Sequence, residues 1–203
     1  GKSTICHGSV IRTDAGEFAV ATARHCIPKI HSVSTVAHDK VKIQGGGAAF
    51  VEPRTASDYA VIFAKTAPGL VTSVALGEGD PKWVVVTRGG APVHLEVKRS
   101  DPGEMTEFDD RCKGDPLCGK CTGRLALTTA NDAVVKTDSG AAVLNERRQL
   151  VGVISTRSYG GVASYCLASL PKCTSAGCSA DDDQFDMGPR PLKVIARPSK
   201  ARP

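Results

Sequence analysis

The chain of 203 residues and 21.2 kDa contains 41% hydrophobic and 23% charged residues. This balance excludes wholesale disorder, a collagen-like chain and a coiled coil, and the length suffices to bury a sizeable core. The net charge is +5, but the segment from Arg190 onward holds five basic residues and no acid, so residues 1–189 balance at 21 bases against 21 acids. Charge alone therefore does not indicate a nucleic-acid-binding body.

The first third of the chain is expected to form β structure. Aromatic residues make up only 4% of the chain, whereas it holds 21 Gly and 12 Pro, a balance that favours short strands joined by turns. The turn residues Asp14-Ala15-Gly16 predict a hairpin between the first two strands. Six strands suit a small closed or nearly closed barrel, and they are expected at 5–12, 17–22, 31–36, 39–44, 48–52 and 59–64.

A second β series is expected after a crossing segment at 66–81, which contains Pro68-Gly69. Its strands are predicted at 82–87, 93–98, 124–129, 141–144, 150–156 and 162–167. Residues 101–123 are rich in charge, Gly and Cys, and they predict an ordered excursion that is not a strand. The expected organisation is an N-terminal β-barrel at 1–65, a C-terminal β-barrel at 82–170, and a flexible tail at 171–203, first with Cys and Asp and then with Pro and basic residues.

Two stretches of the first unit offer a general base and a group that orients it. The stretch Ala21-Thr22-Ala23-Arg24-His25-Cys26 puts an imidazole at a strand end, where it can face a cleft. Asp58 opens an apolar strand and can accept the Nδ1 proton of His25, which fixes the tautomer of the ring. Either residue alone has an ordinary structural explanation, so the prediction depends on the combination.

A third stretch, in the second unit, offers a nucleophile. Ser139 is followed by Gly140, which permits an unusual backbone angle and lets a substrate approach closely. The candidate oxyanion hole comprises Thr137, Asp138 and Ser139, with the backbone N–H groups of Thr137 and Ser139 facing the developing negative charge. The order His25, Asp58, Ser139 then predicts hydrolysis through an acyl-enzyme.

Four fragments resemble, in this order, the motifs of chymotrypsin-like serine proteases. Thr22-Ala23-Arg24-His25-Cys26 is similar to their Thr-Ala-Ala-His-Cys, and Thr137-Asp138-Ser139-Gly140 is similar to their Gly-Asp-Ser-Gly. Cys6-His7-Gly8-Ser9 and Asp58-Tyr59-Ala60-Val61 resemble their Cys-Gly-Gly-Ser and Asp-Ile-Ala-Leu. The layout is most similar to viral polyprotein-processing members. The resemblance implies an all-β fold of two six-stranded antiparallel β-barrels with the active site in the cleft between them.

The resemblance also implies where a substrate binds. Residues 150–155 are similar to the strand that pairs with a bound peptide, and 160–163 to the return strand behind the specificity pocket. Viral enzymes selective for Gln or Glu keep a His where this chain has Ile154, and trypsin keeps an Asp where it has Ala133, so neither preference is implied. Asp132 and Arg157 would favour opposite substrates. The candidate substrate-binding residues are Asp132, Ala133, Lys136, Ile154, Ser155, Thr156 and Arg157.

The eight cysteines leave more than one interpretation open. The resemblance implies a disulfide between Cys6 and Cys26, with two buried thiols as the alternative. Cys112, Cys118 and Cys121 could contribute to a structural zinc site, for which the fourth ligand would be Cys166, Cys173, Cys178 or a His. Disulfides among the six later cysteines explain the same residues equally well. The expected chemistry itself requires no cofactor.

These features together predict a serine endopeptidase with a polypeptide substrate. The chain begins at Gly1 without an initiator Met and has short loops, so we expect it to release itself from a viral precursor polyprotein in the host cytoplasm. Two alternatives stay open: a secreted cellular protease, which the cysteine content favours, and a non-catalytic RNA- or protein-binding domain whose basic tail contacts RNA weakly. The chain contains no run of 18 apolar residues, so no membrane segment is expected.

Overall fold

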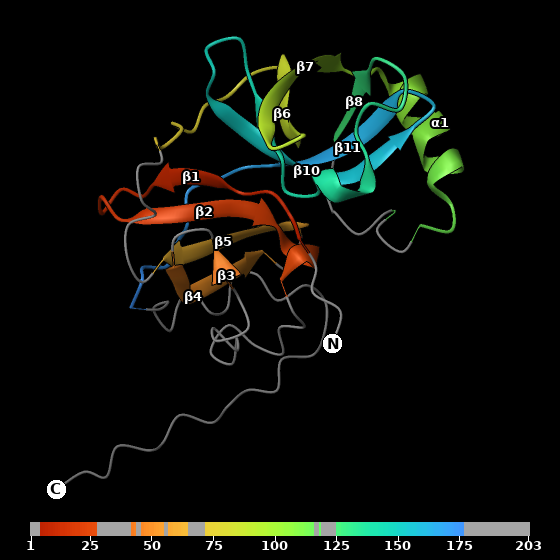
Figure 1. Ribbon diagram of the computed structural model, residues 1–203. Coiled ribbons are helices and arrows are strands. Elements are labelled where there is room, and N and C mark those ends of the chain that lie inside the picture. The colour runs from red at the N-terminus through yellow and green to blue at the C-terminus, as the bar shows by residue number, and fades with distance from the viewer. Residues whose placement is uncertain are drawn as a thin grey trace, which may run out of the picture.

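The computed structural model of the chain describes residues 5–27, 42–43, 46–54, 57–64, 72–115, 118 and 125–176. In this part of the chain two β units lie against each other, a sheet from the N-terminal half and a barrel from the C-terminal half (Figure 1). The strand predicted at 31–36 and the tail beyond residue 176 lie outside the described residues. No described helix is long and apolar enough to cross a membrane.

The N-terminal unit is an antiparallel sheet with the strand order β1-β2-β5-β4-β3. Its strands are β1 (Ser9–Arg12), β2 (Phe18–Ala23), β3 (Lys42–Ile43), β4 (Gly46–Arg54) and β5 (Tyr59–Ala64). The predicted hairpin joins β1 to β2, where Gly16 has a φ of +78° and donates its N–H to the carbonyl of Thr13 over 2.9 Å. β5 lies between β2 and β4, and its residues are buried except for the last, so it is the central strand of the sheet.

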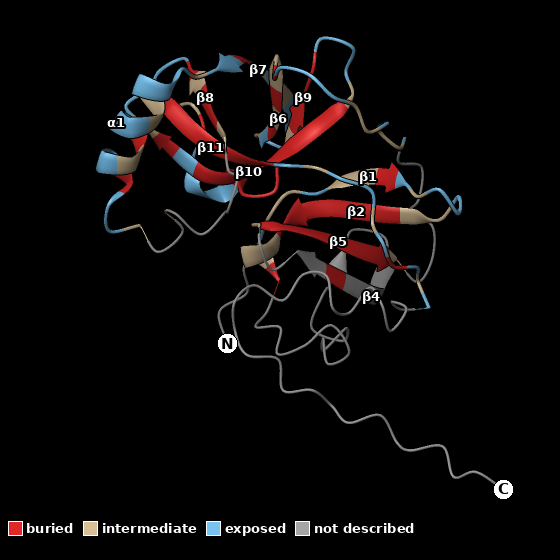
Figure 2. Ribbon diagram, turned by 180° about the vertical axis from the view of Figure 1, so that it is seen from behind, coloured by how far each residue is buried: buried red, intermediate tan, exposed pale blue. Residues whose placement is uncertain are grey.

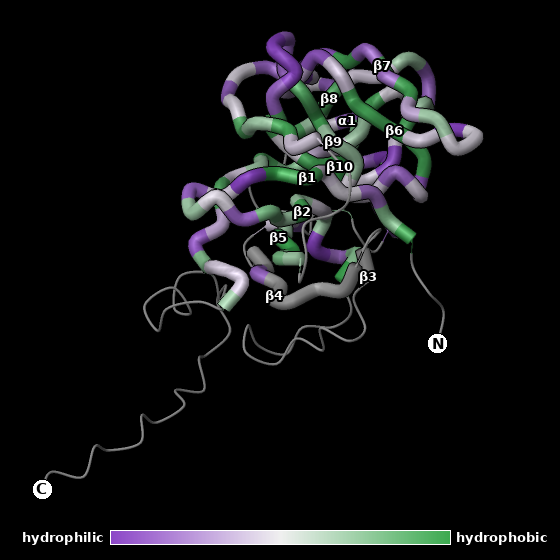
Figure 3. The backbone as a smooth tube through the Cα atoms, turned by 60° about the vertical axis from the view of Figure 1, so that its left-hand side comes forward, coloured by the Kyte–Doolittle hydropathy of each residue, from purple (hydrophilic) through white to green (hydrophobic). Residues whose placement is uncertain are grey.

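The C-terminal unit is a closed barrel with the strand order β10-β11-β8-β7-β6-β9. Its strands are β6 (Trp83–Arg88), β7 (Ala91–Arg99), β8 (Leu125–Thr129), β9 (Ala142–Leu144), β10 (Leu150–Tyr159) and β11 (Val162–Leu167). Small aliphatic side chains and one tyrosine fill its interior, among them Val84, Val86, Leu127, Val143, Ile154 and Tyr165. Figure 3 shows the hydrophobic stretches along the strands and the hydrophilic ones in the connections.

The expected fold of two closed barrels is confirmed only in part. A mainly β chain and one closed six-stranded barrel are present. Within the described residues the N-terminal unit is an open sheet of five strands, so a second full barrel is not confirmed. The strand expected at 39–44 is described only as the short β3, and β10 extends three residues beyond its predicted end at 156.

The charged excursion between β7 and β8 contains a helix, α1 (Pro102–Cys112). The Asp101 side chain accepts from the N–H of Glu104 over 2.7 Å, and the Glu104 side chain accepts from the N–H of Asp101 over 3.0 Å, which forms a capping box. Phe108 and Cys112 are fully buried in a small cluster against the barrel, whereas the outer face of α1 is exposed (Figure 2). The sequence predicted order here without predicting the helix.

One cluster of buried hydrophobic side chains, separate from the barrel interior, joins the two units. Ile11, Val61 and Phe63 of the sheet lie in the same cluster of buried side chains as Leu150 and Val153 of the barrel. In Figure 2 most of β2 and β5 is coloured as buried, and both strands lie in the unit next to β10. The crossing segment adds backbone contacts to both units: Val74 donates to Val10 over 2.7 Å, and Leu150 donates to Ala75 over 2.8 Å. These contacts hold the two units in place relative to each other.

The first six residues of the predicted tail, 171–176, make ordered contacts. Residues 171–176 return to the N-terminal sheet, where buried Glu52 accepts the backbone N–H groups of Lys172 and Cys173 over 3.1 and 2.8 Å. Glu17 accepts from the backbone N–H of Ser175 over 3.1 Å. Carboxylates that satisfy backbone donors in this way stabilise a chain segment that has no regular pattern of its own.

Replacing Glu52 by Ala should lower the free energy of unfolding by about 3 kcal/mol, because buried backbone donors lose a charged acceptor. Urea denaturation measures the loss. The control is Glu96, which is 65% exposed and pairs with Lys82, so that Glu96→Ala should cost less than about 1 kcal/mol. Equal losses in the two variants would contradict the role assigned to Glu52.

Candidate active site

His25 and Asp58 are brought together by the pairing of β2 with β5. Ala23 at the end of β2 is opposite Tyr59 at the start of β5, so the residues just beyond each strand are neighbours. His25 lies in a single 3-10 turn, Arg24–Cys26, that follows β2. The backbone of this turn is fixed to Asp58, because the N–H of His25 donates to Oδ1 over 2.8 Å and the N–H of Arg24 donates to the carbonyl oxygen over 3.1 Å.

The imidazole of His25 connects Asp58 of the N-terminal unit to Ser139 of the C-terminal unit. Its Nδ1 is 2.6 Å from Asp58 Oδ2, and its Nε2 is 2.8 Å from Ser139 Oγ. A carboxylate can only accept, so Nδ1 carries the proton and Nε2 is free to accept from the serine hydroxyl. Asp58 is 5% exposed, and Ser155 Oγ of β10 also donates to its Oδ2 over 2.6 Å. The structure thus brings the three predicted catalytic residues into one hydrogen-bonded row.

Ser139 follows a second 3-10 turn, Lys136–Asp138, and is held against the N-terminal segment. The backbone N–H of His7 donates to the Ser139 carbonyl over 2.8 Å, and Thr22 Oγ1 donates to the His7 carbonyl over 2.7 Å. Gly140 has a φ of +80°, and a Cβ at this position would lie 2.2 Å from the His7 carbonyl oxygen. Only glycine fits here, so the Ser-Gly pair of the motif has a steric cause.

Asp138 has a structural role that differs from the one predicted. Its carboxylate is 0% exposed and accepts hydrogen bonds from Nη1 and Nη2 of Arg88, each over 2.6 Å. The backbone N–H of Val135 donates to the same carboxylate over 2.8 Å, and Arg88 also donates to the carbonyl of Ala133 over 3.0 Å. The hydrogen bond to Asp138 raises the pKa of Arg88 above its ordinary value, so the guanidinium stays charged.

The backbone N–H of Asp138 donates to the carbonyl of Val135 over 2.9 Å, so it is not available to an oxyanion. This corrects the inclusion of Asp138 among the oxyanion donors. The N–H groups of Thr137 and Ser139 have no acceptor among the described residues. They are the two donors expected to face the developing charge.

Two residues that contact the loop before Ser139 were missed as functional candidates. Arg88 is 50 residues from Asp138, and its local sequence, an arginine before a Gly-Gly turn, gives no sign of the ion pair. His7 was named only within a motif fragment, but its backbone contacts Ser139, and its Nε2 is 3.7 Å from Asp138 Oδ1. The neighbouring fragment Cys6-His7-Gly8-Ser9 was the available signal.

The predicted substrate residues of β10 are mostly buried. Ile154 is 0% exposed in the barrel core, and its backbone carbonyl accepts from Gly140 over 2.8 Å while its N–H donates to Ala141 over 2.9 Å. Ile154 therefore anchors the nucleophile loop through its backbone, and its side chain belongs to the barrel core. Ser155 is likewise buried and bonded to Asp58, whereas Thr156 is buried with a hydroxyl that has no partner in the described part of the chain.

The other predicted substrate residues lie at the surface, apart from Ala133, which is half-buried beside Arg88. Asp132 is exposed and accepts the backbone N–H of Gly161 over 2.9 Å, which ties it to the β10–β11 turn. Lys136 is exposed, and its carbonyl is 3.3 Å from Ser139 Oγ. Arg157 is exposed and donates from Nε to Tyr159 over 3.0 Å, a contact that raises the pKa of Arg157. The side chains of Lys136 and Arg157 are therefore both exposed at the surface.

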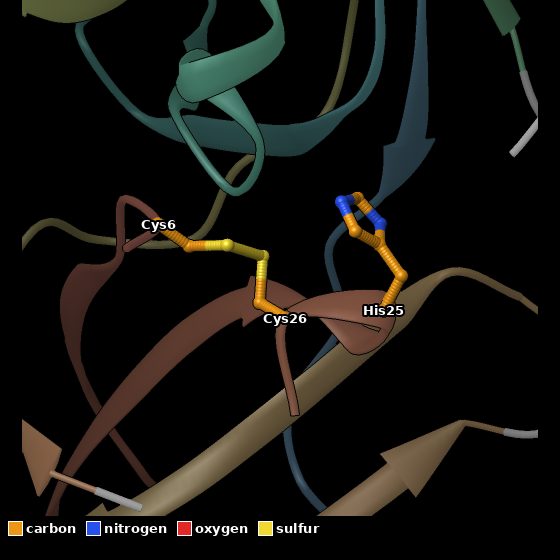
Figure 4. A group of neighbouring side chains, drawn as sticks. All are labelled: Cys6, His25 and Cys26. Carbon is orange, nitrogen blue, oxygen red and sulfur yellow. A yellow bond between two sulfur atoms is a disulfide. The ribbon is translucent and has the colours of Figure 1, made fainter. Parts of the chain in front are cut away.

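The disulfide implied between Cys6 and Cys26 is present beside His25 (Figure 4). Of the predicted zinc ligands, Cys112 is buried and Cys118 is partly exposed, while Cys121 lies outside the described residues. Cys166 and Cys173 are disulfide-bonded and so are not available as thiolate ligands. The zinc site remains a prediction, with fewer candidates for its fourth ligand.

Neither a protein-family model nor a curated protein matches the sequence, but the fold matches solved structures. The scabies mite inactivated protease paralogue S-D1 matches with a TM-score of 0.53 and 16% identity, over 80% of this chain and 81% of that one. The NS6 protease from murine norovirus 1 matches with a TM-score of 0.50 and 14% identity, over 80% and 90%. Mouse neuropsin, a serine protease of the limbic system, matches with a TM-score of 0.50 and 20% identity, over 80% and 83%. The chain therefore has a chymotrypsin-like fold.

Replacing Arg88 by Gln should lower the free energy of unfolding by about 3 kcal/mol, because it leaves a buried carboxylate without its cation. Arg88→Lys should lower the free energy of unfolding by less, since lysine keeps the positive charge but not the bidentate hydrogen bond. The control is Arg99→Gln: this guanidinium is 58% exposed and 3.7 Å from Asp80, so the loss should stay below about 1 kcal/mol. Chemical denaturation that gives the same loss for Arg88→Gln and Arg99→Gln would contradict the role of Arg88.

Proposed function

We propose that the protein is a serine endopeptidase. The observation that supports this most strongly is the row in which His25 contacts Asp58 through Nδ1 and Ser139 through Nε2. The row joins residues from both β units at distances suited to proton transfer. A chymotrypsin-like fold is compatible with the proposal but does not decide it, because one of the similar structures is an inactivated protease paralogue.

The geometry suggests the following sequence of steps. Ser139 Oγ attacks the carbonyl carbon of the peptide bond while His25 Nε2 takes its proton, and Asp58 stabilises the resulting imidazolium. The N–H groups of Thr137 and Ser139 donate to the oxyanion of the tetrahedral intermediate. His25 then gives the proton to the leaving amine, which breaks the C–N bond and leaves an ester on Ser139. A water molecule, deprotonated by His25, hydrolyses that ester and restores the serine.

We further propose that the substrate is a viral polyprotein that includes this chain. The fold is shared with a norovirus protease, and the β10–β11 connection is reduced to the turn Gly160-Gly161, in keeping with a compact viral enzyme. Neither Ile154 nor Ala133 provides a pocket charge, so we propose no preference for Gln, Glu, Lys or Arg at the cleaved bond. A precursor extended by its natural flanking sequence should release the chain, and the same precursor with Ser139→Ala should not.

Replacing Ser139 by Ala should abolish hydrolysis of a peptide library while urea denaturation shows an unchanged fold. Ser139→Cys should keep measurable hydrolysis, because a thiol can also act as a nucleophile beside an imidazole. Cleavage of the library by the Ser139→Ala protein would rule out this residue as the nucleophile. A wild-type protein that cleaves no peptide would favour the alternative of a non-catalytic binding domain.

Replacing Asp58 by Asn should lower the rate of peptide hydrolysis by about 10⁴-fold, because an amide no longer holds the required tautomer of His25. Ser155→Ala should lower it by about tenfold, since it removes one hydrogen bond to the same carboxylate and leaves the tautomer intact. A useful comparison is Ser100→Ala, since that hydroxyl contacts Thr128 far along the barrel and its loss should leave the rate unchanged. A rate for Asp58→Asn near that of the wild type would contradict the mechanism.

A further inference from the structure

The disulfide between Cys6 and Cys26 lies beside the imidazole of His25. Both sulfur atoms and a ring nitrogen of His25 lie within 4.8 Å of one another (Figure 4). All three residues are partly exposed, so small solutes can reach them. Two cysteine sulfurs and an imidazole nitrogen form a set of donors that binds Zn²⁺ in preference to harder cations.

We propose that these residues form a zinc site that opens only when the disulfide is reduced, and that zinc bound there inhibits the enzyme. In the oxidised protein the two sulfurs are bonded to each other and cannot act as thiolates. A dithiol reductant cleaves the S–S bond by thiol–disulfide exchange: two electrons and two protons pass to Cys6 and Cys26, and the reductant becomes a disulfide. Zn²⁺ then displaces one proton from each thiol and forms two Zn–S bonds and one Zn–N bond.

The donor atoms must move to accommodate the metal, above all the two sulfurs, which are bonded to each other in the disulfide. With Zn–S bonds of about 2.3 Å and a Zn–N bond of about 2.0 Å, tetrahedral angles put the sulfurs about 3.8 Å apart and each sulfur about 3.5 Å from the nitrogen. The ligand atoms already lie within 4.8 Å, and reduction frees the sulfurs to separate. Three protein ligands leave the fourth position for a water molecule.

Zinc at this site competes directly with the proposed chemistry, and this part of the inference depends on the proposed function. His25 uses Nδ1 to donate to Asp58 and Nε2 to accept from Ser139. A zinc ion on either nitrogen removes one of these contacts, and with it the ability of the ring to act as a general base. Because general-base catalysis contributes at least about 100-fold, saturating zinc should lower the rate of the reduced enzyme by at least that factor.

The first test compares zinc inhibition in the two redox states. Enzyme is reduced with a dithiol, freed of reductant without air, and assayed for peptide hydrolysis with zinc, with zinc and a chelator, and with neither. We expect inhibition of the reduced enzyme that the chelator reverses, and little inhibition of the oxidised enzyme. Equal inhibition of both forms, or loss of activity on reduction regardless of the chelator, would overturn the proposal.

Variants distinguish this site from the other cysteines. Cys6→Ser together with Cys26→Ser should make zinc inhibition of the reduced enzyme disappear, with each protein compared against its own zinc-free rate. The matched control is Cys118→Ser, because Cys118 is partly exposed and belongs to the other predicted zinc cluster. That variant should remain inhibited after reduction. Zinc inhibition that survives in the double variant would place the metal elsewhere and contradict the proposal.

A spectroscopic measurement tests the site without relying on catalysis. Reduced Ser139→Ala protein is titrated with Co²⁺, which reports thiolate ligation through a ligand-to-metal charge-transfer band. We expect a band component that is lost when Cys6→Ser and Cys26→Ser are added and retained when Cys118→Ser is added. If the wild type hydrolyses peptides but no band component is lost, the zinc site alone fails. If a component is lost but the wild type hydrolyses no peptide, the zinc site is supported and the proposed function is contradicted.

Discussion

The buried carboxylate of Asp58 is the group on which the arrangement of the cleft depends. It lies at the start of the central strand of the N-terminal sheet and is 5% exposed. It accepts the backbone N–H of His25, the ring Nδ1–H of His25 and the hydroxyl of Ser155 from the barrel. A buried carboxylate is costly without such partners, so its hydrogen bonds fix both the orientation of the imidazole and the approach of the two units.

A second buried carboxylate, Asp138, does for the nucleophile loop what Asp58 does for the base. Its ion pair with Arg88 joins the nucleophile loop to the end of β6, and its contact with the N–H of Val135 closes the turn before Ser139. The close packing of Gly140 against the His7 carbonyl then fixes the loop against the N-terminal segment. Since the disulfide of Cys6 holds that same segment to the residue after His25, base and nucleophile share one support.

Local sequence predicted the parts of the site that depend on neighbours along the chain. Short segments bounded by turn residues predicted β2 and β5, and Gly140 was expected to permit an unusual backbone angle, as its positive φ shows. The resemblance added the order of the three residues. The helix α1 was missed although its capping signal, Asp101-Pro102-Gly103-Glu104, was present in a stretch judged by its charge.

The remaining features depend on contacts between distant segments. Arg88 at the end of β6 pairs with Asp138, 50 residues later. Glu52 accepts from the backbone of residues 172–173, more than a hundred residues later. Neither pairing has a local signature, because a single charged residue in a strand is ordinarily solvated. Ser155 was assigned to substrate binding from the resemblance of its strand, and the hydrogen bond of its hydroxyl to Asp58 in the other unit likewise has no local signature.

The most direct test of the central claim is the reaction of the folded protein with a fluorophosphonate, followed by peptide mapping. If His25 activates Ser139, the probe should form one adduct, on Ser139, and the adduct should disappear in the His25→Ala protein and after denaturation. Labelling at the same rate in the His25→Ala protein, or no adduct on Ser139 in the folded wild type, would contradict the account.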